Sequence, residues 1–411
     1  MPSPYRALFA APGTRSFSAA GFLGRMPLSM MGIGVVTMIS QLTGRYGLAG
    51  TLSATLALAA AVIGPQISRM VDQYGQRRVL RPATLVALTA SAGLLCAAHY
   101  GWPDWVLFVC AVGIGAVPSL GAMIRARWAA LYRDTPQLHT AYSFESVVDE
   151  VCFIFGPIIS IGLSTAWFPE AGPLLAAGFL AVGVFWLTAQ RDTEPVPHPR
   201  ERRGGTAMRA PGLQVLVTTF VATGAIFGAV DVVTVAFADE QGHKAAASVV
   251  LALYAAGSCV AGLVFGLLRF AGRPEPRWLL GICAMAVSMI PLLLVGNLPF
   301  LAVALFVAGL SIAPTMITTM SLIEQHVPRA QLTEGMTWIS TGLAVGVALG
   351  SSVAGWVIDA AGARAGYGVP AVSGAVAVAV GFLGYRRLSR PAPGRGGTVE
   401  HHSEREERHV A

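Results

Sequence analysis

The sequence predicts an all-α integral membrane protein with twelve transmembrane helices in two pseudo-symmetric six-helix bundles, with both termini in the cytoplasm. Three observations support this prediction: a composition poor in charge, a series of apolar runs of spanning length, and basic residues concentrated in alternate loops. Of the 411 residues, 54% are hydrophobic and 12% are charged. Soluble proteins carry about 25% charged residues, so the composition already indicates a membrane protein.

The apolar runs fall into two sets of six, and each run approaches the roughly 20 residues that a helix needs to cross a bilayer. The first set lies at about 17–38, 46–67, 80–99, 105–124, 141–164 and 171–189. The second set lies at about 212–237, 246–268, 277–296, 299–321, 335–358 and 366–385. We therefore expect one bundle within residues 1–190 and a second within residues 211–389.

The segments outside these runs are polar. Residues 191–210 are rich in proline and charge, which predicts a solvated cytoplasmic linker between the bundles. Residues 390–411 include a charged run from Glu404 to Arg408, and we expect this cytoplasmic tail to be disordered.

Lysine and arginine predict the orientation. Of the 28 such residues, only Arg45, Lys244 and Arg364 fall in the loops that an N-in, C-in arrangement places outside, and Arg25 falls within a span. All the others lie in the linker, the terminal segments or the alternate loops. Cytoplasmic loops carry the excess of basic residues in membrane proteins, so both termini are expected inside the cell.

The two sets repeat at an offset of roughly 195 residues, which is typical of a duplicated transporter half. Gln137 and Leu138 match Gln331 and Leu332. At the same offset, Gly156 meets Gly350. Two unrelated apolar segments would explain any one such pair, but not six span starts in succession.

The loop after the second span carries a motif. Asp72, Gly75, Arg77 and Arg78 follow one another in the order and spacing of a signature loop, and here the sequence resembles the major facilitator superfamily of transporters. The resemblance implies a gating loop whose aspartate lies at the start of the eleventh span, at Thr333-Glu334, where a helix dipole favours a carboxylate. An ordinary basic cytoplasmic loop would explain the arginines alone.

A second motif lies in the fifth span, where Gly156 and Pro157 resemble the glycine-rich stretch of drug–proton antiporters of that superfamily. Proline bends a helix and glycine admits a close neighbour. A generic kink in a packed helix is the alternative. The chain has Cys152 and Ser160 where these exporters often have glycine.

Few ionisable residues fall within the spans, and each is costly there. We interpret them as a coupling site for protons and substrate; they are Arg25 in the first span, Glu145, Asp149 and Glu150 in the fifth, and Asp231 in the seventh. Arg25 and the acids at 149 and 150 lie at similar depth, and the resemblance makes the first and fifth helices neighbours. In this hypothesis Arg25 holds one carboxylate ionised, and a second carboxylate binds and releases a proton.

Two alternatives without a role in coupling remain open. The charges of the first and fifth spans would also suit a structural lock at the cytoplasmic mouth, with Arg125 included. Arg125 and Arg127 lie at the cytoplasmic end of the fourth span, which lacks the mid-membrane arginine usual in the family. Asp231 would either contact a cationic or hydrogen-bonding substrate or face a water-filled outer vestibule.

Small residues recur every four positions in two spans, which permits close helix contacts. We expect both stripes at the interface between the bundles; they are Gly342, Gly346, Gly350 and Ala354 in the eleventh span, and Ser258, Gly262 and Gly266 in the eighth.

The sequence predicts a transporter and not an enzyme. It contains no zinc-protease, serine-hydrolase or phosphate-loop motif, and we expect no cofactor, no metal site and no nucleic-acid partner. The predicted function is secondary active transport of a small lipophilic or weakly polar molecule across the inner membrane by a monomer, with proton-coupled export ahead of uptake. A channel, a receptor or a membrane-embedded enzyme is the alternative of another class.

Overall fold

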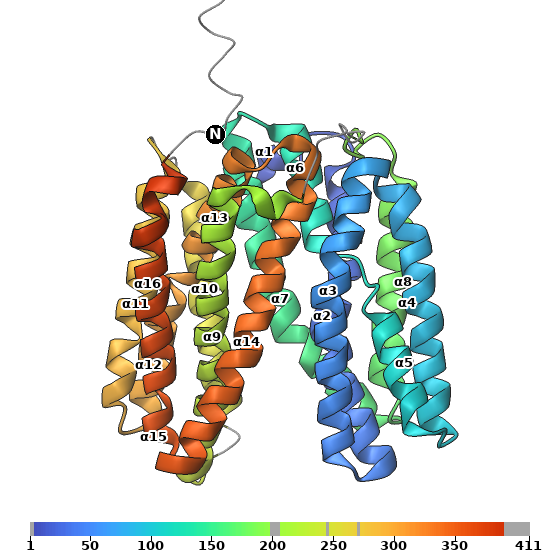
Figure 1. Cartoon of the computed structure of the whole chain (residues 1–411), viewed down its shortest axis with the longest axis vertical. Helices are drawn as coiled ribbons and strands as arrows, with labels where there is room; N and C mark the ends of the chain where they lie inside the picture. Colours follow the sequence, from blue (N-terminus) through green and yellow to red (C-terminus); the bar gives the residue numbers. More distant parts are fainter. Residues whose placement is uncertain (1–3, 198–205, 244–245, 269–271, 390–411) are drawn as a thin grey trace, which may run out of the picture.

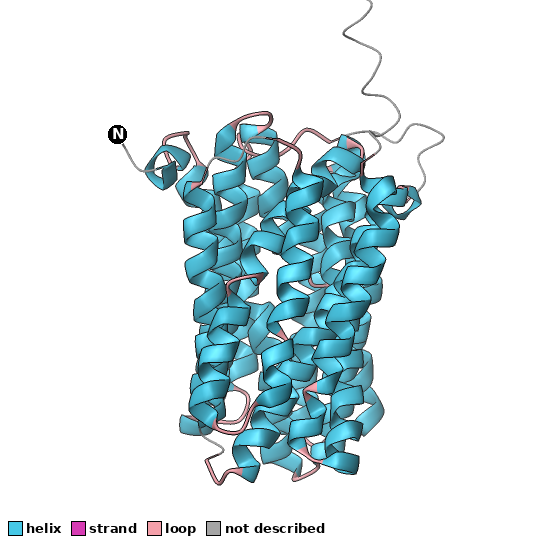
Figure 2. Ribbon diagram, turned by 90° about the vertical axis from the view of Figure 1, so that its left-hand side faces the viewer, coloured by secondary structure: helices cyan, strands magenta, loops and turns pink. Residues whose placement is uncertain are grey.

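The computed structural model describes residues 4–197, 206–243, 246–268 and 272–389. In this part of the chain every regular element is a helix, and the long helices run side by side along one axis (Figure 1, Figure 2). The expected all-α class is confirmed for these residues. The tail at 390–411, which we expected to be disordered, lies outside them.

The helices form two groups, one on each side of the linker in sequence, and the groups lie on opposite sides of Figure 1. The N-terminal group consists of α1 (Pro4–Leu8), α2 (Thr14–Thr43), α3 (Tyr46–Tyr74), α4 (Gln76–His99), α5 (Asp104–Ile114), α6 (Leu120–Tyr132), α7 (Pro136–Ala166) and α8 (Ala171–Ala189). The C-terminal group consists of η1 (Ala207–Arg209), α9 (Pro211–Glu240), α10 (Ala246–Leu267), α11 (Pro274–Ser288), η2 (Ile290–Leu294), α12 (Leu298–Gly309), α13 (Ile312–His326), η3 (Arg329–Gln331), α14 (Leu332–Ala361), α15 (Ala363–Gly366) and α16 (Gly368–Leu388).

We call the two ends of the bundle the linker end and the opposite end. The linker end carries α1, the turn between α3 and α4, and η1, whereas the opposite end carries α15 and the turn between α2 and α3 (Figure 1). These names describe the molecule without assigning a side of a membrane.

Eleven helical stretches of the described chain are long and apolar enough to cross a membrane. The expected continuous span at 105–124 is wrong, because α5 ends at Ile114 and α6 begins at Leu120. Pro118 has no N–H and would clash with the carbonyl four residues earlier, so the helix stops before it. The expected span at 299–321 lies within one apolar stretch of spanning length, Leu298–His326, which has a short break between α12 and α13. The two breaks therefore occupy corresponding spans of the two groups.

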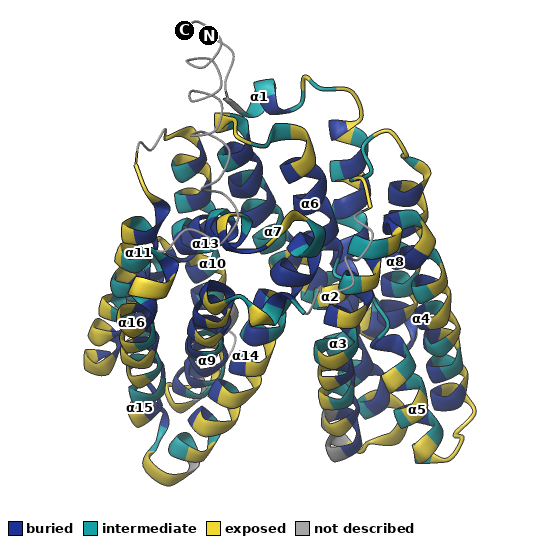
Figure 3. Ribbon diagram, turned by 45° about the horizontal axis from the view of Figure 1, so that its top comes forward, coloured by how far each residue is buried: buried dark blue, intermediate teal, exposed yellow. Residues whose placement is uncertain are grey.

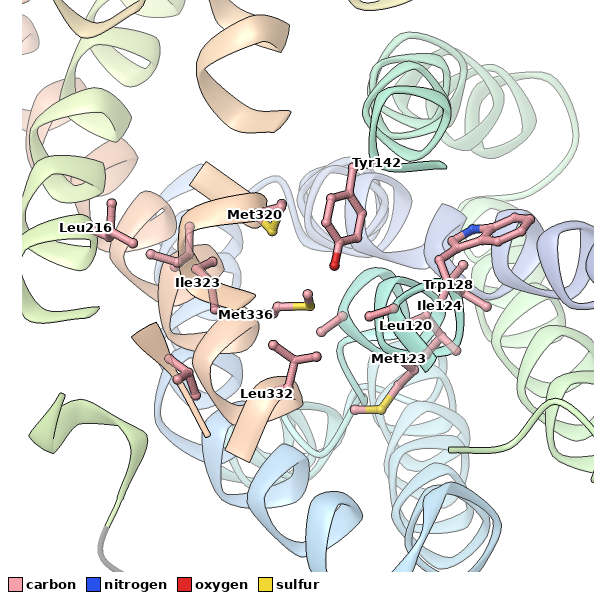
Figure 4. Packing of buried hydrophobic residues seen from close by; sticks show 14 of the residues in the cluster. Leu120, Met123, Ile124, Trp128, Tyr142, Leu216, Met320, Ile323, Leu332 and Met336 are labelled. Carbon is pink, nitrogen blue, oxygen red and sulfur yellow. The ribbon is translucent and has the colours of Figure 1, made fainter. Parts of the chain in front are cut away.

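Buried apolar side chains show where the groups meet. One cluster at the linker end joins both groups, with Leu120, Met123 and Tyr142 of the N-terminal group facing Met320 and Met336 of the C-terminal group (Figure 4). Two further clusters lie toward the opposite end, and each belongs to a single group. Among the described residues, the groups are thus packed together at the linker end and share no apolar cluster at the opposite end.

The outer faces of the groups are apolar. Figure 3 shows exposed residues along the outer helices α11 and α16, where Leu280 is 70% exposed and Leu383 is 84% exposed. Large exposed apolar surfaces are rare on soluble monomers. Contact with lipid tails explains them, as the composition predicted.

The glycine stripe of α14 was assigned to the wrong interface. A side-chain carbon at Gly346 would lie 2.0 Å from the carbonyl oxygen of Val221, and one at Gly350 would lie 2.1 Å from that of Ala225. Both carbonyls belong to α9, so this stripe packs within the C-terminal group and not between the groups. The stripe of α10 does lie between the groups, since Gly262 faces Val147 of α7.

Candidate functional site

Three of the charged residues expected within the spans form a cluster between α2 and α7. The Arg25 guanidinium pairs with the Glu145 carboxylate and donates a 2.8 Å hydrogen bond to Oδ1 of Asp149. Arg25 is 4% exposed and Glu145 is 0% exposed. A buried charge without a partner costs several kcal/mol, so each side chain needs the other. The structure brings Arg25 to Asp149, as their similar depth predicted, and adds Glu145 one turn earlier, whereas Glu150, expected at the same depth, is not part of the cluster.

Arg125 belongs to the same cluster, although our coupling hypothesis left it out and only the structural alternative included it. Its Nη2 donates to Oδ2 of Asp149 at 2.5 Å, and Nε1 of Trp128 on the next turn donates to Oε1 of Glu145 at 2.7 Å. The break before α6 explains this arrangement, because the helix starts again beside Asp149. A side-chain carbon on Gly121, in the first turn of α6, would lie 3.9 Å from Oδ1 of Asp149.

Arg127 faces away from this cluster. Its guanidinium donates to Oε1 of Gln76 at 2.8 Å and to the carbonyl of Leu187 at 3.1 Å. It therefore ties α6 to α4 and α8 at the linker end, as a structural residue of the N-terminal group.

Glu150 lies where the two groups touch at mid-length of α7. Its Oε1 accepts a 2.7 Å hydrogen bond from the Ser258 hydroxyl of α10. Among the described residues it has no ion pair and no other hydrogen bond. The adjacent Asp149, in contrast, has two arginine partners. Glu150 is thus the acid of α7 without a cationic partner.

Asp231 lies on α9, toward the opposite end, and its side chain is exposed. The described residues give it no hydrogen bond and no ion pair. It interacts electrostatically with Tyr254 of α10, which also interacts with Glu150. Asp231 is therefore separate from the Arg25 cluster but shares a neighbour with Glu150.

The predicted gating loop contacts the C-terminal group at the linker end. Asp72 accepts hydrogen bonds from the backbone N–H groups of Thr333 at 3.3 Å and Glu334 at 2.9 Å. A carboxylate suits this place because the first N–H groups of a helix have no partner within the helix. The contact is the one that the resemblance implied. One turn earlier, the hydroxyls of Ser68 and Thr337 lie 2.7 Å apart.

The rest of the loop contacts the linker. Gly75 has φ of 91°, which favours glycine, and it ends α3. The N–H of Arg77 donates to Oε1 of Glu194 at 3.0 Å, whereas Arg78 is exposed. The loop therefore touches both the start of α14 and the start of the linker.

Gly156 and Pro157 lie where α7 packs on α2. A side-chain carbon on Gly156 would lie 2.0 Å from the hydroxyl of Ser29, so any larger residue would force Ser29 to move. Ser160 donates to the carbonyl of Met30 at 3.0 Å. The pair of helices that carries the charge cluster is thus held close by this segment.

Three residues of the site were not predicted. Trp128 could have been found, because it lies three residues after Arg125 on one helix face. Ser258 was noted only as a small residue. Tyr254 lies one turn before Ser258, and no sequence signal separates it from other buried tyrosines.

Comparison with known proteins identifies the fold and the family. The family model of the major facilitator superfamily matches residues 17–269 and again residues 215–408. Similar solved structures include a human organic anion transporter (TETRAN), with TM-score 0.67 and 15% identity over 92% of this chain and 100% of that one. A bacterial homologue of the iron transporter ferroportin, in an outward-facing state, has TM-score 0.72 and 13% identity over 92% and 99%. The Escherichia coli fucose:proton symporter has TM-score 0.68 and 14% identity over 92% and 98%. No curated protein sequence matches.

Proposed function

The chain belongs to the major facilitator superfamily, and on that premise we propose that it exports a small lipophilic or weakly polar molecule in exchange for protons. It is a transporter and not an enzyme. Substrate, direction and coupling ion are the proposed part.

We place the protein in the inner membrane as a monomer, with the linker end in the cytoplasm. The concentration of basic residues in the linker and the loops at that end supports this orientation. In this arrangement α5 and α6 together make one crossing, which gives twelve, and residues 1–190 and 211–389 form the two bundles. The packing at the linker end then corresponds to a state open to the outside.

The observation that carries the proposal is the contrast between Asp149 and Glu150. The cluster of Arg25, Arg125, Glu145 and Asp149 holds two cations and two acids, so it is balanced by itself. Glu150 has only the hydroxyl of Ser258, which belongs to the other group. A carboxyl group without a counter-ion is suited to take up and release a proton, and its one contact breaks if the groups separate at the linker end. We therefore propose Glu150 as the proton carrier and the balanced cluster as its fixed support.

The experiment is transport by cells that lack their own exporters. We would measure accumulation of a panel of dyes and antibiotics, with and without a protonophore, in cells expressing the wild type, Glu150→Gln, Asp149→Asn or Asp192→Asn. The last is a control, because Asp192 is an exposed linker residue. We expect lower accumulation with the wild type and the control, and loss of this effect with the protonophore and with Glu150→Gln.

The outcomes separate the alternatives when protein levels in the membrane are measured alongside. Normal levels of Glu150→Gln without transport support a coupling role. Loss of both Glu150→Gln and Asp149→Asn from the membrane favours a structural lock. Unchanged accumulation of every compound would contradict the proposal of drug export, and raised accumulation would indicate uptake.

A further inference from the structure

We propose that Glu150, Asp231, Phe227 and Tyr254 form the binding site for a lipophilic organic cation. This inference rests on the proposed function, because it names the substrate class of the same transporter.

Three helices bring these side chains together. The rings of Phe227 on α9 and Tyr254 on α10 form an edge-on pair with centroids 6.2 Å apart. Asp231 lies four residues after Phe227, and therefore on the same face of α9. Ser258 lies four residues after Tyr254 on α10 and donates to Glu150 of α7. Tyr254 lies near enough to both carboxylates to feel their charge, so both acids lie near the aromatic pair.

The charges around this pair are not balanced. Both arginines that pair with acids of α7, Arg25 and Arg125, are held by Glu145 and Asp149. No cation of the described chain pairs with Asp231 or Glu150. A bound cation would supply the missing charge, whereas an anion would be repelled.

The tyrosine hydroxyl gives an independent sign of a ligand. Tyr254 is 7% exposed, and its buried hydroxyl has no hydrogen-bond partner. Buried polar groups usually have a partner, so this hydroxyl is available to hydrogen-bond a ligand. Because Tyr254 lies near both carboxylates, we assign that ligand to the same site.

The aromatic rings define the cation further. Cations with a delocalised or shielded charge bind the faces of aromatic rings, and an apolar body suits the apolar helices around them. Calcium takes six to eight oxygen ligands, which is more than two carboxylates and one hydroxyl supply. The site therefore fits a monovalent cation with an apolar body, such as a protonated lipophilic amine.

The test compares two ions of the same shape and opposite charge. Binding of tetraphenylphosphonium and tetraphenylborate would be measured by equilibrium dialysis on the purified full chain in lipid nanodiscs. We expect the cation to bind at least tenfold more tightly than the anion, after subtraction of binding to empty nanodiscs. Asp231→Asn and Glu150→Gln should each weaken cation binding roughly tenfold. Asp192→Asn should leave it unchanged, and a thermal melt would show that each variant is folded.

Two outcomes would overturn the inference: equal binding of the two ions, or unchanged cation binding in folded Asp231→Asn and Glu150→Gln. If one variant fails to fold, the other variant and the comparison of the two ions still decide. Cation binding without export would contradict the proposed function alone. Export of neutral compounds without preference for the cation would contradict this inference alone.

Discussion

Two helix crossings occupy corresponding places in the two groups, but they are built differently. Where α2 meets α7, Arg25 pairs with Glu145 and Asp149 across the contact. Where α9 meets α14, glycines such as Gly346 lie against backbone carbonyls. At the repeat offset, α14 has Ile339 in place of Glu145. The fold therefore needs a close crossing at this place but not a charged one, which supports a working role for the charges of the N-terminal group.

The largest expected effect comes from a substitution that leaves a buried charge without its partner. Arg25→Met removes a partner of Glu145 and Asp149, and breaking a buried ion pair in this way costs about 3–5 kcal/mol. We expect a strongly lowered thermal midpoint of the purified protein and low levels in the membrane.

A fourfold replacement makes the first crossing apolar, like the second. It combines Arg25→Met and Arg125→Met with Glu145→Ile and Asp149→Leu. Since apolar replacement of a whole buried ion pair is often neutral or stabilising, we expect most of the thermal stability to return while transport stays lost. Transport by the fourfold variant would show that the cluster only stabilises the fold. The difference between the two helix crossings would then have no role in transport.

The glycine crossing gives the next largest effect. In Gly346→Ala the added carbon meets a backbone oxygen of Val221, which cannot move aside as a side chain could. We expect a loss of about 3 kcal/mol, read as a lowered thermal midpoint. Gly355→Ala on the same helix is the matched control, because nothing lies within 4 Å of its added carbon. Equal midpoints for the two variants would contradict the packing described for α14.

The sequence predicted most of the helices and the repeat, because hydrophobic length is a local property. The meeting of Arg25 with Asp149 was expected from their depth together with the family resemblance, which makes the two helices neighbours. The sequence did not predict that α5 ends at Ile114, and the coupling hypothesis left out Arg125, which only the structural alternative included. It also assigned the stripe of Gly346 to the wrong partner. A stripe of small residues shows that some helix comes close, but only the tertiary arrangement decides which helix does so.

The proposed cation site was harder to predict than the charge cluster. Asp231 stood out as an ionisable residue in an apolar run, and such residues are rare enough to be noticed. Tyr254 and Phe227 are ordinary residues of membrane helices, and their meeting depends on the packing of α9 on α10. The polar half of that site could therefore be predicted from the sequence, whereas the aromatic half could not.

The smallest predicted effect concerns Asp72, which joins the two groups at the linker end. Asp72 holds the first N–H groups of α14 from outside its own group, and loss of such a cap costs about 0.5–2 kcal/mol. We expect Asp72→Ala to speed hydrogen exchange of the backbone amides at Thr333 and Glu334, measured by mass spectrometry. Asp72→Asn should have a weaker effect, because asparagine also caps helices. Asp104→Asn, which removes an exposed ion pair at the opposite end, should leave these amides unchanged. Unchanged exchange in Asp72→Ala would mean that the apolar cluster alone holds the two groups together at the linker end. The contact of Asp72 with α14 would then contribute nothing to that packing.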